Sequence, residues 1–271
     1  MNTKRPAAKP TSKRKITPKA ASVEVEVQTV SAASSSLTPT SYTEINRLHG
    51  NALGVLSGAV VVTAAREGEG SSLLAYTMAL KSAESGTKTL LVDLNMKSHG
   101  LTKQLNLARK AWGLSSAELP RVLGCVEHDD MQPNLSYLGA PTDAQSIAWL
   151  KDHNHAKAFF DELGKTYSQI IIDTTPVGLT NRANADPVLL AGAAARTVLI
   201  TLAGVTPPKQ VKRAAHQLEK AGAVLAGIVL NDWQNPSLKD DMMKLVAGLQ
   251  KRTPGLASWL RHKVLNSDSL S

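Results

Sequence analysis

The segment Gly68-Glu69-Gly70-Ser71-Ser72 follows an apolar run and precedes an apparent helix. Its two glycines let the backbone turn so that successive N–H groups point inward, which makes a nest for an anion at a helix N-terminus. Ser72 stands where a hydroxyl would ligate Mg²⁺ in a phosphate-binding loop. The segment therefore predicts such a loop, with all five residues as candidate contacts to ATP or ADP.

The position that a phosphate-binding loop fills with lysine holds Ser71. Charge-assisted contacts are worth about 1.5–3 kcal/mol each, so the missing lysine predicts nucleotide binding weaker by about one to two decades. The transition state of phosphoryl transfer should lose more, because it depends on charge stabilisation. Arg66 or Lys97 could supply another positive charge. The alternative for the loop alone is a tight strand-to-helix turn without a ligand.

Three further polar residues end apolar runs, namely Asp93, Asp173 and Asn231. Ligands collect at the carboxyl edge of a parallel sheet, so both carboxylates could hold Mg²⁺ together with Ser72. The Asn231 amide could read an adenine edge. The alternatives are that each aspartate caps the following helix and that Asn231 forms a turn.

Other kinds of chemistry find little support in the sequence. His153 and His155 are two residues apart in a predicted helix, which is the wrong spacing for shared metal ligation on one face. Cys125 is the only cysteine, so no internal disulfide is possible, and it has no identifiable paired base. No metal-ligand cluster and no Ser/His/Asp set emerges.

Short apolar runs alternate with helical patterns along most of the chain. The predicted strands are 58–65, 88–94, 135–140, 168–176, 196–204 and 223–232. The predicted helices are 43–53, 71–86, 147–167, 183–194, 207–222 and 237–252. Continuously apolar strands between helices predict an α/β fold, a doubly wound and mostly parallel sheet with helices on both faces, as in P-loop NTPases.

The basic charge of the chain is concentrated at its N-terminus. The 271 residues carry a formal net charge of +9, and seven positive charges without any acid lie in residues 1–20. We therefore predict a disordered basic arm over 1–41, the α/β domain over 42–250 and a C-terminal tail over 251–271. The arm could contact anionic lipid, whereas the nearly balanced remainder does not favour a nucleic-acid partner.

The order of these segments resembles the cytoplasmic domain of bacterial tyrosine kinases (BY-kinases) and their capsular or exopolysaccharide relatives, within the MinD/ParA-type deviant P-loop ATPases. The resemblance covers most of 43–232. TAAREGEGSS looks like the Walker A motif, normally Pro-Gly-Glu-Gly-Lys-Ser. LLVDLNMKSHGL looks like Walker A′, normally Asp-x-Asp-x-Arg-x-Pro, and IIIDTTPVG looks like Walker B, normally Asp-x-Pro-Pro.

The departures from these motifs fall on catalytic positions. Relative to the family pattern, Ser71 replaces the lysine of Walker A, and Asn95, Lys97 and His99 replace the second aspartate, the arginine and the proline of Walker A′. The C-terminal tyrosine cluster of the family is missing. These joint losses argue against an active tyrosine kinase and leave Asp93 and Asp173 as vestigial catalytic residues.

The resemblance also implies partners. EINRLHG looks like the family's N-terminal Glu-x-x-Arg-x-x-Arg helix, used for subunit contacts, so Glu44 and Arg47 are candidate interface residues of a homo-oligomer, although Gly50 replaces the last arginine. In the family the domain docks on a membrane polysaccharide co-polymerase, a chain-length regulator. We expect a cytoplasmic protein, peripheral to the inner membrane through that partner, with weak binding of ATP, ADP and Mg²⁺ or none.

Three functions remain open from the sequence. The first is a catalytically degenerate, BY-kinase-like accessory protein of exopolysaccharide or capsule biosynthesis and export. The second is an atypical but active ATPase of the MinD/ParA class that controls assembly or positioning. The third is a partitioning-type protein that uses its basic arm on DNA, which would require salt-dependent DNA binding.

Overall fold

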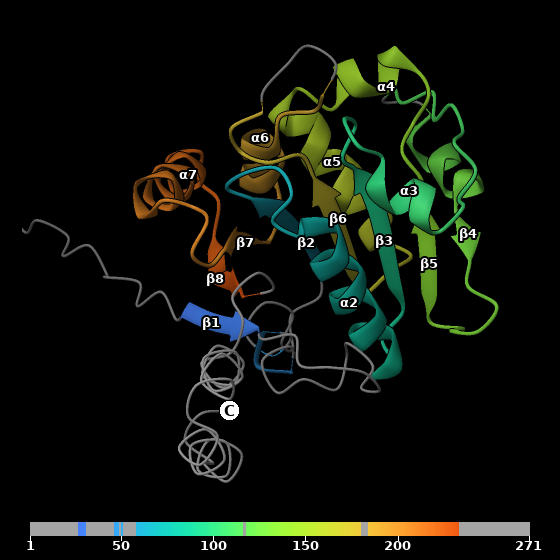
Figure 1. The fold of residues 1–271 in the computed structure, drawn as a ribbon. Helices are drawn as coiled ribbons and strands as arrows, with labels where there is room; N and C mark the ends of the chain where they lie inside the picture. Colours follow the sequence, from blue (N-terminus) through green and yellow to red (C-terminus); the bar gives the residue numbers. More distant parts are fainter. Residues whose placement is uncertain are drawn as a thin grey trace, which may run out of the picture.

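The predicted α/β fold is confirmed in a computed structural model that describes residues 27–30, 46–48, 50, 58–115, 118–179 and 184–232. In this part of the chain one sheet has the strand order β1-β8-β7-β2-β6-β3-β5-β4 (Figure 1). The strands are β1 (Val27–Val30), β2 (Gly58–Ala64), β3 (Thr89–Leu94), β4 (Glu127–His128), β5 (Leu135–Leu138), β6 (Gln169–Thr174), β7 (Arg196–Leu202) and β8 (Leu225–Asn231).

Helices alternate with the strands along most of the described chain, except that β5 directly follows β4 and α5 directly follows α4. They are α2 (Ser71–Glu84), α3 (Gly100–Gln104), α4 (Ala144–Trp149), α5 (His153–Gly164), α6 (Pro187–Ala193) and α7 (Pro208–Lys220), with a 3₁₀ segment, η2 (Leu119–Cys125). Two predicted helix boundaries are confirmed by the geometry. Gly86, just beyond α2, has the positive φ of 84° expected of a glycine after a helix C-terminus, and Pro208 is the first residue of α7.

The order of the strands places the glycine-containing loop at the switch point of the sheet. β2 pairs in parallel with β6 on one side and with β7 on the other. Only the edge pair of β4 and β5 is antiparallel among the described strands. In open α/β sheets ligands bind outside the carboxyl ends of the strands, where the connections diverge. The loop that follows β2 lies there.

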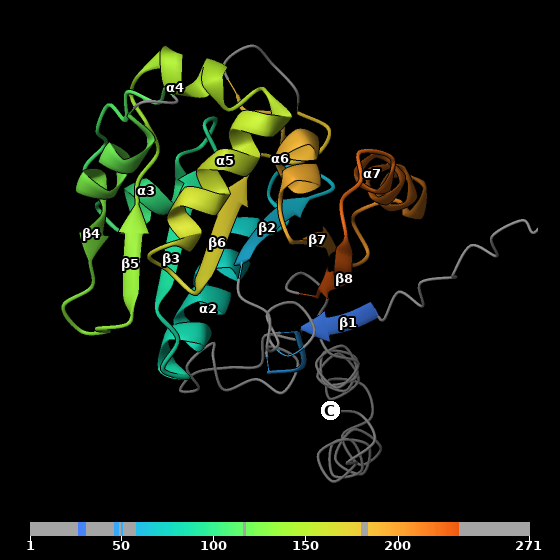
Figure 2. The ribbon, with the colours of Figure 1, turned by 180° about the vertical axis from the view of Figure 1, so that it is seen from behind.

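Helices cover both faces of the sheet, as Figures 1 and 2 show from opposite sides. Leu74 and Met78 of α2 pack in one buried cluster with Val62 of β2. Phe159 of α5 packs in a second cluster, on the other face, with Val61 of the same strand. Strands buried on both faces need apolar residues at every position, which explains why their sequences read as continuous apolar runs.

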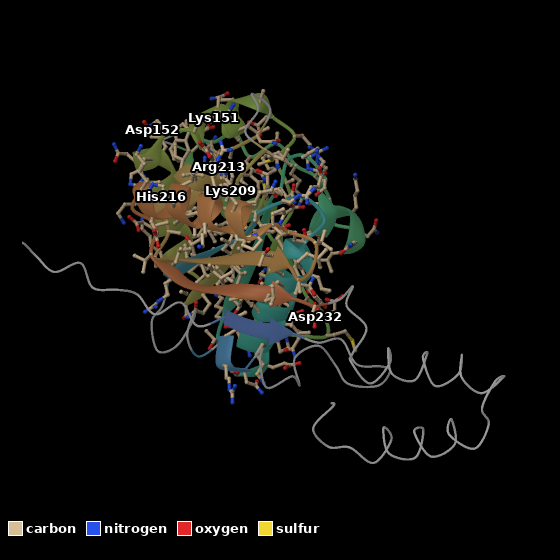
Figure 3. All side chains as sticks on the ribbon, turned by 60° about the vertical axis from the view of Figure 1, so that its left-hand side comes forward. Lys151, Asp152, Lys209, Arg213, His216 and Asp232 are labelled. Atoms are coloured by element: carbon tan, nitrogen blue, oxygen red, sulfur yellow. The ribbon has the colours of Figure 1, made fainter. Side chains whose placement is uncertain are left out.

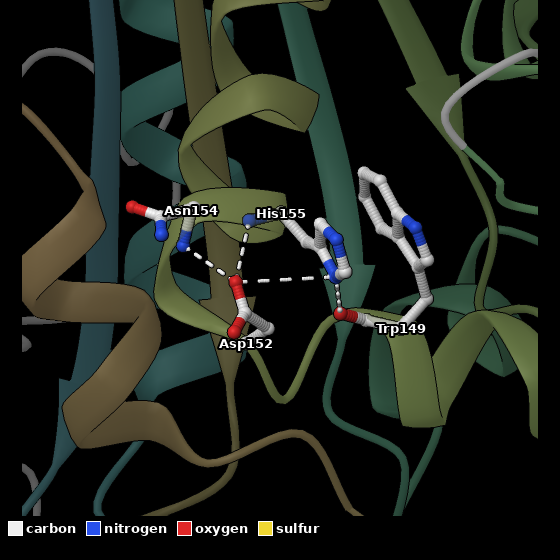
Figure 4. A network of polar contacts seen from close by, with 4 residues as sticks. All are labelled: Trp149, Asp152, Asn154 and His155. Atoms are coloured by element: carbon white, nitrogen blue, oxygen red, sulfur yellow. Dashed lines mark hydrogen bonds and ion pairs between the residues drawn. The ribbon is translucent and has the colours of Figure 1, made fainter.

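The single helix predicted over 147–167 is wrong, because two helices occupy this segment. α4 ends at Trp149 and α5 begins at His153, after an extended Asp152 with φ −98° and ψ 134°. The Asp152 carboxylate accepts hydrogen bonds from the backbone N–H groups of Asn154 (2.9 Å) and His155 (3.1 Å), as Figure 4 shows. An aspartate at this position satisfies orphan N–H groups of a new helix, so the local cap interrupts an otherwise continuous amphipathic pattern.

Two predicted segments lie wholly or partly outside the described residues. Residues 46–48 and 50 are helical, in agreement with the predicted 43–53 helix, whereas the predicted helix over 237–252 lies outside the described part of the chain. Within the predicted disordered arm the structure describes Val27–Val30, which form β1 beside β8. No helix in the described residues has the length and apolar character needed to cross a membrane.

Candidate nucleotide-binding site

The loop between β2 and α2 has the backbone shape expected of an anion nest. Gly68 and Gly70 adopt positive φ values of 83° and 95°, which non-glycine residues rarely reach. Gly70 precedes α2 and caps it without a side-chain hydrogen bond. The first N–H groups of a 14-residue helix therefore meet no side-chain cap at the carboxyl edge of the sheet.

Glu69 is buried beneath the loop. Its carboxylate accepts hydrogen bonds from the backbone N–H of Arg66 (2.8 Å) and from the hydroxyl of Thr206, and only 2% of the residue is exposed. Its backbone carbonyl accepts a hydrogen bond from the Asn231 amide at 3.0 Å. The hydrogen bonds of Glu69 and Asn231 thus hold the loop in its conformation. Adenine recognition by Asn231 stays a prediction.

A second contact disfavours any side chain at Gly70. A Cβ at this position would lie 2.9 Å from Nδ2 of Asn231, so the Asn231 amide would have to move away from the Glu69 carbonyl. The amide that holds the Glu69 carbonyl therefore occupies the space beside Gly70. Sequence reasoning found both glycines but missed Thr206, because nothing in its own neighbourhood indicates that it meets Glu69 across the fold.

Ser72 and Asp173 meet directly at the centre of the site. The Ser72 hydroxyl donates a 2.5 Å hydrogen bond to Oδ2 of Asp173, and Oδ1 of this buried carboxylate has no hydrogen-bond partner among the described residues. Burial raises the pKa of Asp173 to about 7, and the neighbouring Asp93 charge adds to the rise. The hydrogen bond from Ser72 opposes this rise by favouring the ionised form, and the nearby polar side chains of Ser71 and Asn95 act in the same direction.

Asp93 is engaged in a different way. Its Oδ1 accepts the backbone N–H of Asn95 (3.0 Å), and its Oδ2 accepts both the backbone N–H (2.9 Å) and the hydroxyl (2.6 Å) of Thr102. The carboxylate therefore fixes the turn after β3 and the helix α3. The alternative that Asp93 caps the following helix is supported, because Thr102 lies in the first turn of α3. The partner itself could not be found from the sequence, since Thr102 lies nine residues away and carries no local signal of the contact.

These surroundings provide a test of the fit for Mg²⁺. Ser72 and Asp173 present a hydroxyl and a carboxylate side by side, and Oδ1 of Asp173 is a buried acceptor that no protein donor uses. Both oxygens of Asp93 already serve protein donors. Oxygen ligands suit Mg²⁺, so Ser72 and Asp173 fit the ion, whereas ligation by Asp93 would take an oxygen from the groups that hold α3.

Neither of the two candidate replacement cations is seen to fill the lysine's place. Nζ of Lys97 makes a 2.7 Å ion pair with Glu67 on the outside of the loop. Arg66 is exposed, and its guanidinium makes no ion pair with the described residues. Ser71 itself is buried beside Asp173. In the described part of the site, the position that would carry the charge therefore holds an uncharged hydroxyl.

Candidate residues elsewhere do not join this site. Arg47 is exposed on the helical segment 46–48, and Glu44 lies outside the described residues. His155 stacks on Trp149 with ring centroids 4.4 Å apart, next to the Asp152 cap (Figure 4). In the part of the chain that the structure covers, no three or more His, Cys, Asp or Glu side chains gather into a metal-ligand cluster.

The sequence relatives of the chain are named as tyrosine-protein kinases, the family that its motifs resemble. No protein-family model matches the chain. The tyrosine-protein kinase CpsD of Streptococcus agalactiae is 28% identical over 173 residues, which are 64% of this chain and 74% of the relative. The protein of the same name from Streptococcus pneumoniae is 27% identical over 190 residues, which are 68% of this chain and 78% of the relative.

Solved structures show the same fold. The chimerical protein CapA2B2 superposes with a TM-score of 0.59 at 22% identity, over 70% of this chain and 85% of that chain. The MinD cell division protein of Aquifex aeolicus gives a TM-score of 0.51 at 16% identity, over 76% and 86% of the two chains. The chain is thus similar to bacterial tyrosine kinases in sequence, on a fold that it shares with MinD-type P-loop proteins.

Proposed function

We propose that this chain is a catalytically degenerate relative of the bacterial tyrosine kinases that works in exopolysaccharide or capsule biosynthesis and export. Its role is to bind a membrane co-polymerase, or chain-length regulator, rather than to transfer phosphate. The polysaccharide setting rests on the family resemblance. The loss of catalysis rests on the chemistry of the candidate site.

The observation that carries the proposal is that Ser71, beside the buried Asp173, occupies the position where a lysine is expected. A lysine at position 71 would place an ammonium beside the buried Asp173 and the phosphates of a nucleotide. With serine there, Asp173 has only hydroxyl and amide neighbours to favour its charge, and its pKa is raised to about 7. Such a site keeps the backbone nest but lacks the side-chain charge that phosphoryl transfer uses.

Retained recognition without catalysis has a physical basis in this fold. The nest of Gly68 and Gly70 and the oxygen pair of Ser72 and Asp173 persist. ATP or ADP with Mg²⁺ could therefore bind weakly and act as a signal rather than as a substrate. The exposed Arg47 is available for a subunit contact, and the basic N-terminal arm provides charge for anionic lipid at the inner membrane.

A second function has one observation in its favour. Arg66 begins the loop, is exposed and makes no ion pair in the described region, so its guanidinium is free to move towards a bound nucleotide. If it did so, the chain could work as an atypical ATPase of the MinD/ParA class that controls assembly or positioning. ATP turnover that is lost in Arg66→Ala would support this alternative.

Calorimetry with ATP and Mg²⁺ separates the two functions. We expect weak binding or none for the natural chain, and binding tighter by about one to two decades for Ser71→Lys, since one charge-assisted contact is restored. Ser85→Lys, which adds the same charge at the exposed far end of α2, should not improve binding. Micromolar binding together with steady ATP turnover by the natural chain would contradict the proposal that the chain is catalytically degenerate.

A further inference from the structure

A cleft of about 870 Å³ lies beside the phosphate-binding loop, on the face of the sheet that carries α6 and α7. Its walls come from the start of the loop (65–67), the segment after β6 (176–179), the beginning of α6 and one side of α7. Gly68 to Ser72 do not line it. The cleft is therefore distinct from the nest and from the Ser72–Asp173 pair.

One face of α7 forms the long wall of the cleft. Gln210, Arg213, Gln217 and Lys220 all line it, and their spacing of three and four residues puts them on the same side of a helix. Ten residues of α-helix extend about 15 Å. The wall can therefore contact an elongated ligand at several points, and Figure 3 shows Arg213 on this helix with Lys209 and His216.

The close packing of α6 against the end of α7 sets the back of the cleft. A Cβ at Gly192 would lie 2.4 Å from the carbonyl oxygen of Ala221, so only glycine permits this approach. Ala221 itself lines the cleft. The wall is therefore held by backbone packing and does not depend on the charged side chains at its surface.

The charges around the cleft favour an anion. Arg66, Arg213 and Lys220 line it and make no ion pairs with the described residues. The carboxylates that line it are Glu67 and Asp186. Glu67 is paired with Lys97, and Asp186 accepts the backbone N–H of Val188 as the cap of α6. Three positive and two negative side chains therefore line the cleft, and one of the negative ones is already paired, so the balance of charge is positive.

The remaining lining indicates what else the ligand carries. Gln210 and Gln217 offer amides that can both donate and accept hydrogen bonds, which suits hydroxyl groups. Leu179 and Val188 add apolar surface. Small-molecule sites commonly combine such a volume with a few placed polar groups.

We propose that this cleft binds a small molecule in which two or more phosphates are joined to a hydroxyl-rich part, the chemistry of a nucleoside diphosphate sugar. Arg66, Arg213 and Lys220 contact the phosphates, and Gln210 and Gln217 contact the hydroxyl groups. Because the cleft does not use the nest, this inference is independent of the function proposed above.

The test uses the full chain, titrated at low salt with UDP-glucose and, separately, with pyrophosphate. We expect Arg213→Glu and Lys220→Glu each to weaken binding of UDP-glucose by about tenfold or more, since a charge-assisted contact becomes a repulsion. Lys212→Glu is the matched control, because Lys212 is exposed on the same helix but does not line the cleft. Ser72→Ala should leave UDP-glucose binding unchanged, and UDP-glucose should bind more tightly than pyrophosphate.

Several results would overturn the inference. No binding of either probe at millimolar concentration would do so, as would equal weakening by Lys212→Glu and Arg213→Glu, which indicates only general surface charge. Loss of binding in Ser72→Ala would place the ligand on the nest instead. Equal affinity for the two probes would show that the amides and the apolar wall make no contribution to binding of the sugar nucleotide. Circular dichroism checks that each variant is folded.

Discussion

Asp93 and Asp173 are direct register neighbours on the parallel strands β3 and β6, yet their carboxylates have opposite surroundings. Asp93 accepts hydrogen bonds from two backbone N–H groups and one hydroxyl. Asp173 accepts one hydroxyl, from Ser72, and keeps an oxygen without a donor. The same strand position therefore gives one carboxylate a structural task and leaves the other available to a ligand.

Asp93→Asn should destabilise the fold. The asparagine NH₂ group would face the backbone N–H groups of Asn95 or Thr102, which are also donors. One buried polar group would then stay without a partner, which costs about 1–3 kcal/mol. Chemical denaturation at neutral pH measures the change in the free energy of unfolding. Asp161→Asn is the control, because Asp161 is exposed on α5 and forms a surface ion pair with Lys157. A loss no larger than that of the control would contradict the anchoring role.

The contribution of Asp173 to the stability of the metal-free protein should fall as pH rises from about 4 to about 7. Folding raises the pKa of Asp173 to about 7, from about 3.9 in an unfolded chain. In this window the folded state keeps a proton that the unfolded state has released, so rising pH favours unfolding. Above about pH 7 both states have released it, and the contribution of Asp173 no longer changes.

Asp173→Asn should remove this dependence on pH while its amide oxygen still accepts the Ser72 hydroxyl. The measurement is the melting temperature of the natural chain and the variant at several pH values in the presence of a chelator. The difference between the two should change across pH 4–7 and stay level above it. A constant difference would mean that the buried carboxylate does not retain its proton.

Gly192→Ala should destabilise the packing of α6 on α7. Alanine favours a helix over glycine by up to about 1 kcal/mol, but the added Cβ would lie 2.4 Å from the Ala221 carbonyl oxygen. Overpacking against backbone costs about 1–3 kcal/mol, so the net effect is a loss. Gly164→Ala, with no atom within 4 Å of the added Cβ, should be neutral or stabilising. Thermal unfolding of both variants compares the two positions.

Asp152→Ala should weaken the start of α5. The variant loses the side-chain acceptor for the N–H groups of Asn154 and His155, and loss of such a cap costs about 0.5–2 kcal/mol. Denaturant unfolding measures the change, with Asp161→Ala on the same helix as control. If both variants unfold at the same midpoint, the cap is not what separates α4 from α5.

The sequence alone determined the layered α/β fold and the location of the candidate site. Strands buried on both faces must be continuously apolar, and Gly68, Gly70 and Gly86 occupy backbone conformations that other residues avoid. Such signals are local, so they can be read without knowing the fold. The replacement of the expected lysine by Ser71 is local in the same way.

Only the tertiary structure decided which partner each polar residue of the site contacts. Asp93 and Asp173 look equivalent as strand-ending aspartates, but Thr102 reaches only the first, and Ser72 bonds only to the second. Thr206 and Asn231 meet Glu69 from distant elements, and the cleft beside α7 gathers residues from four parts of the chain. These contacts join residues far apart in sequence, and their geometry exists only once the strands are ordered in the sheet.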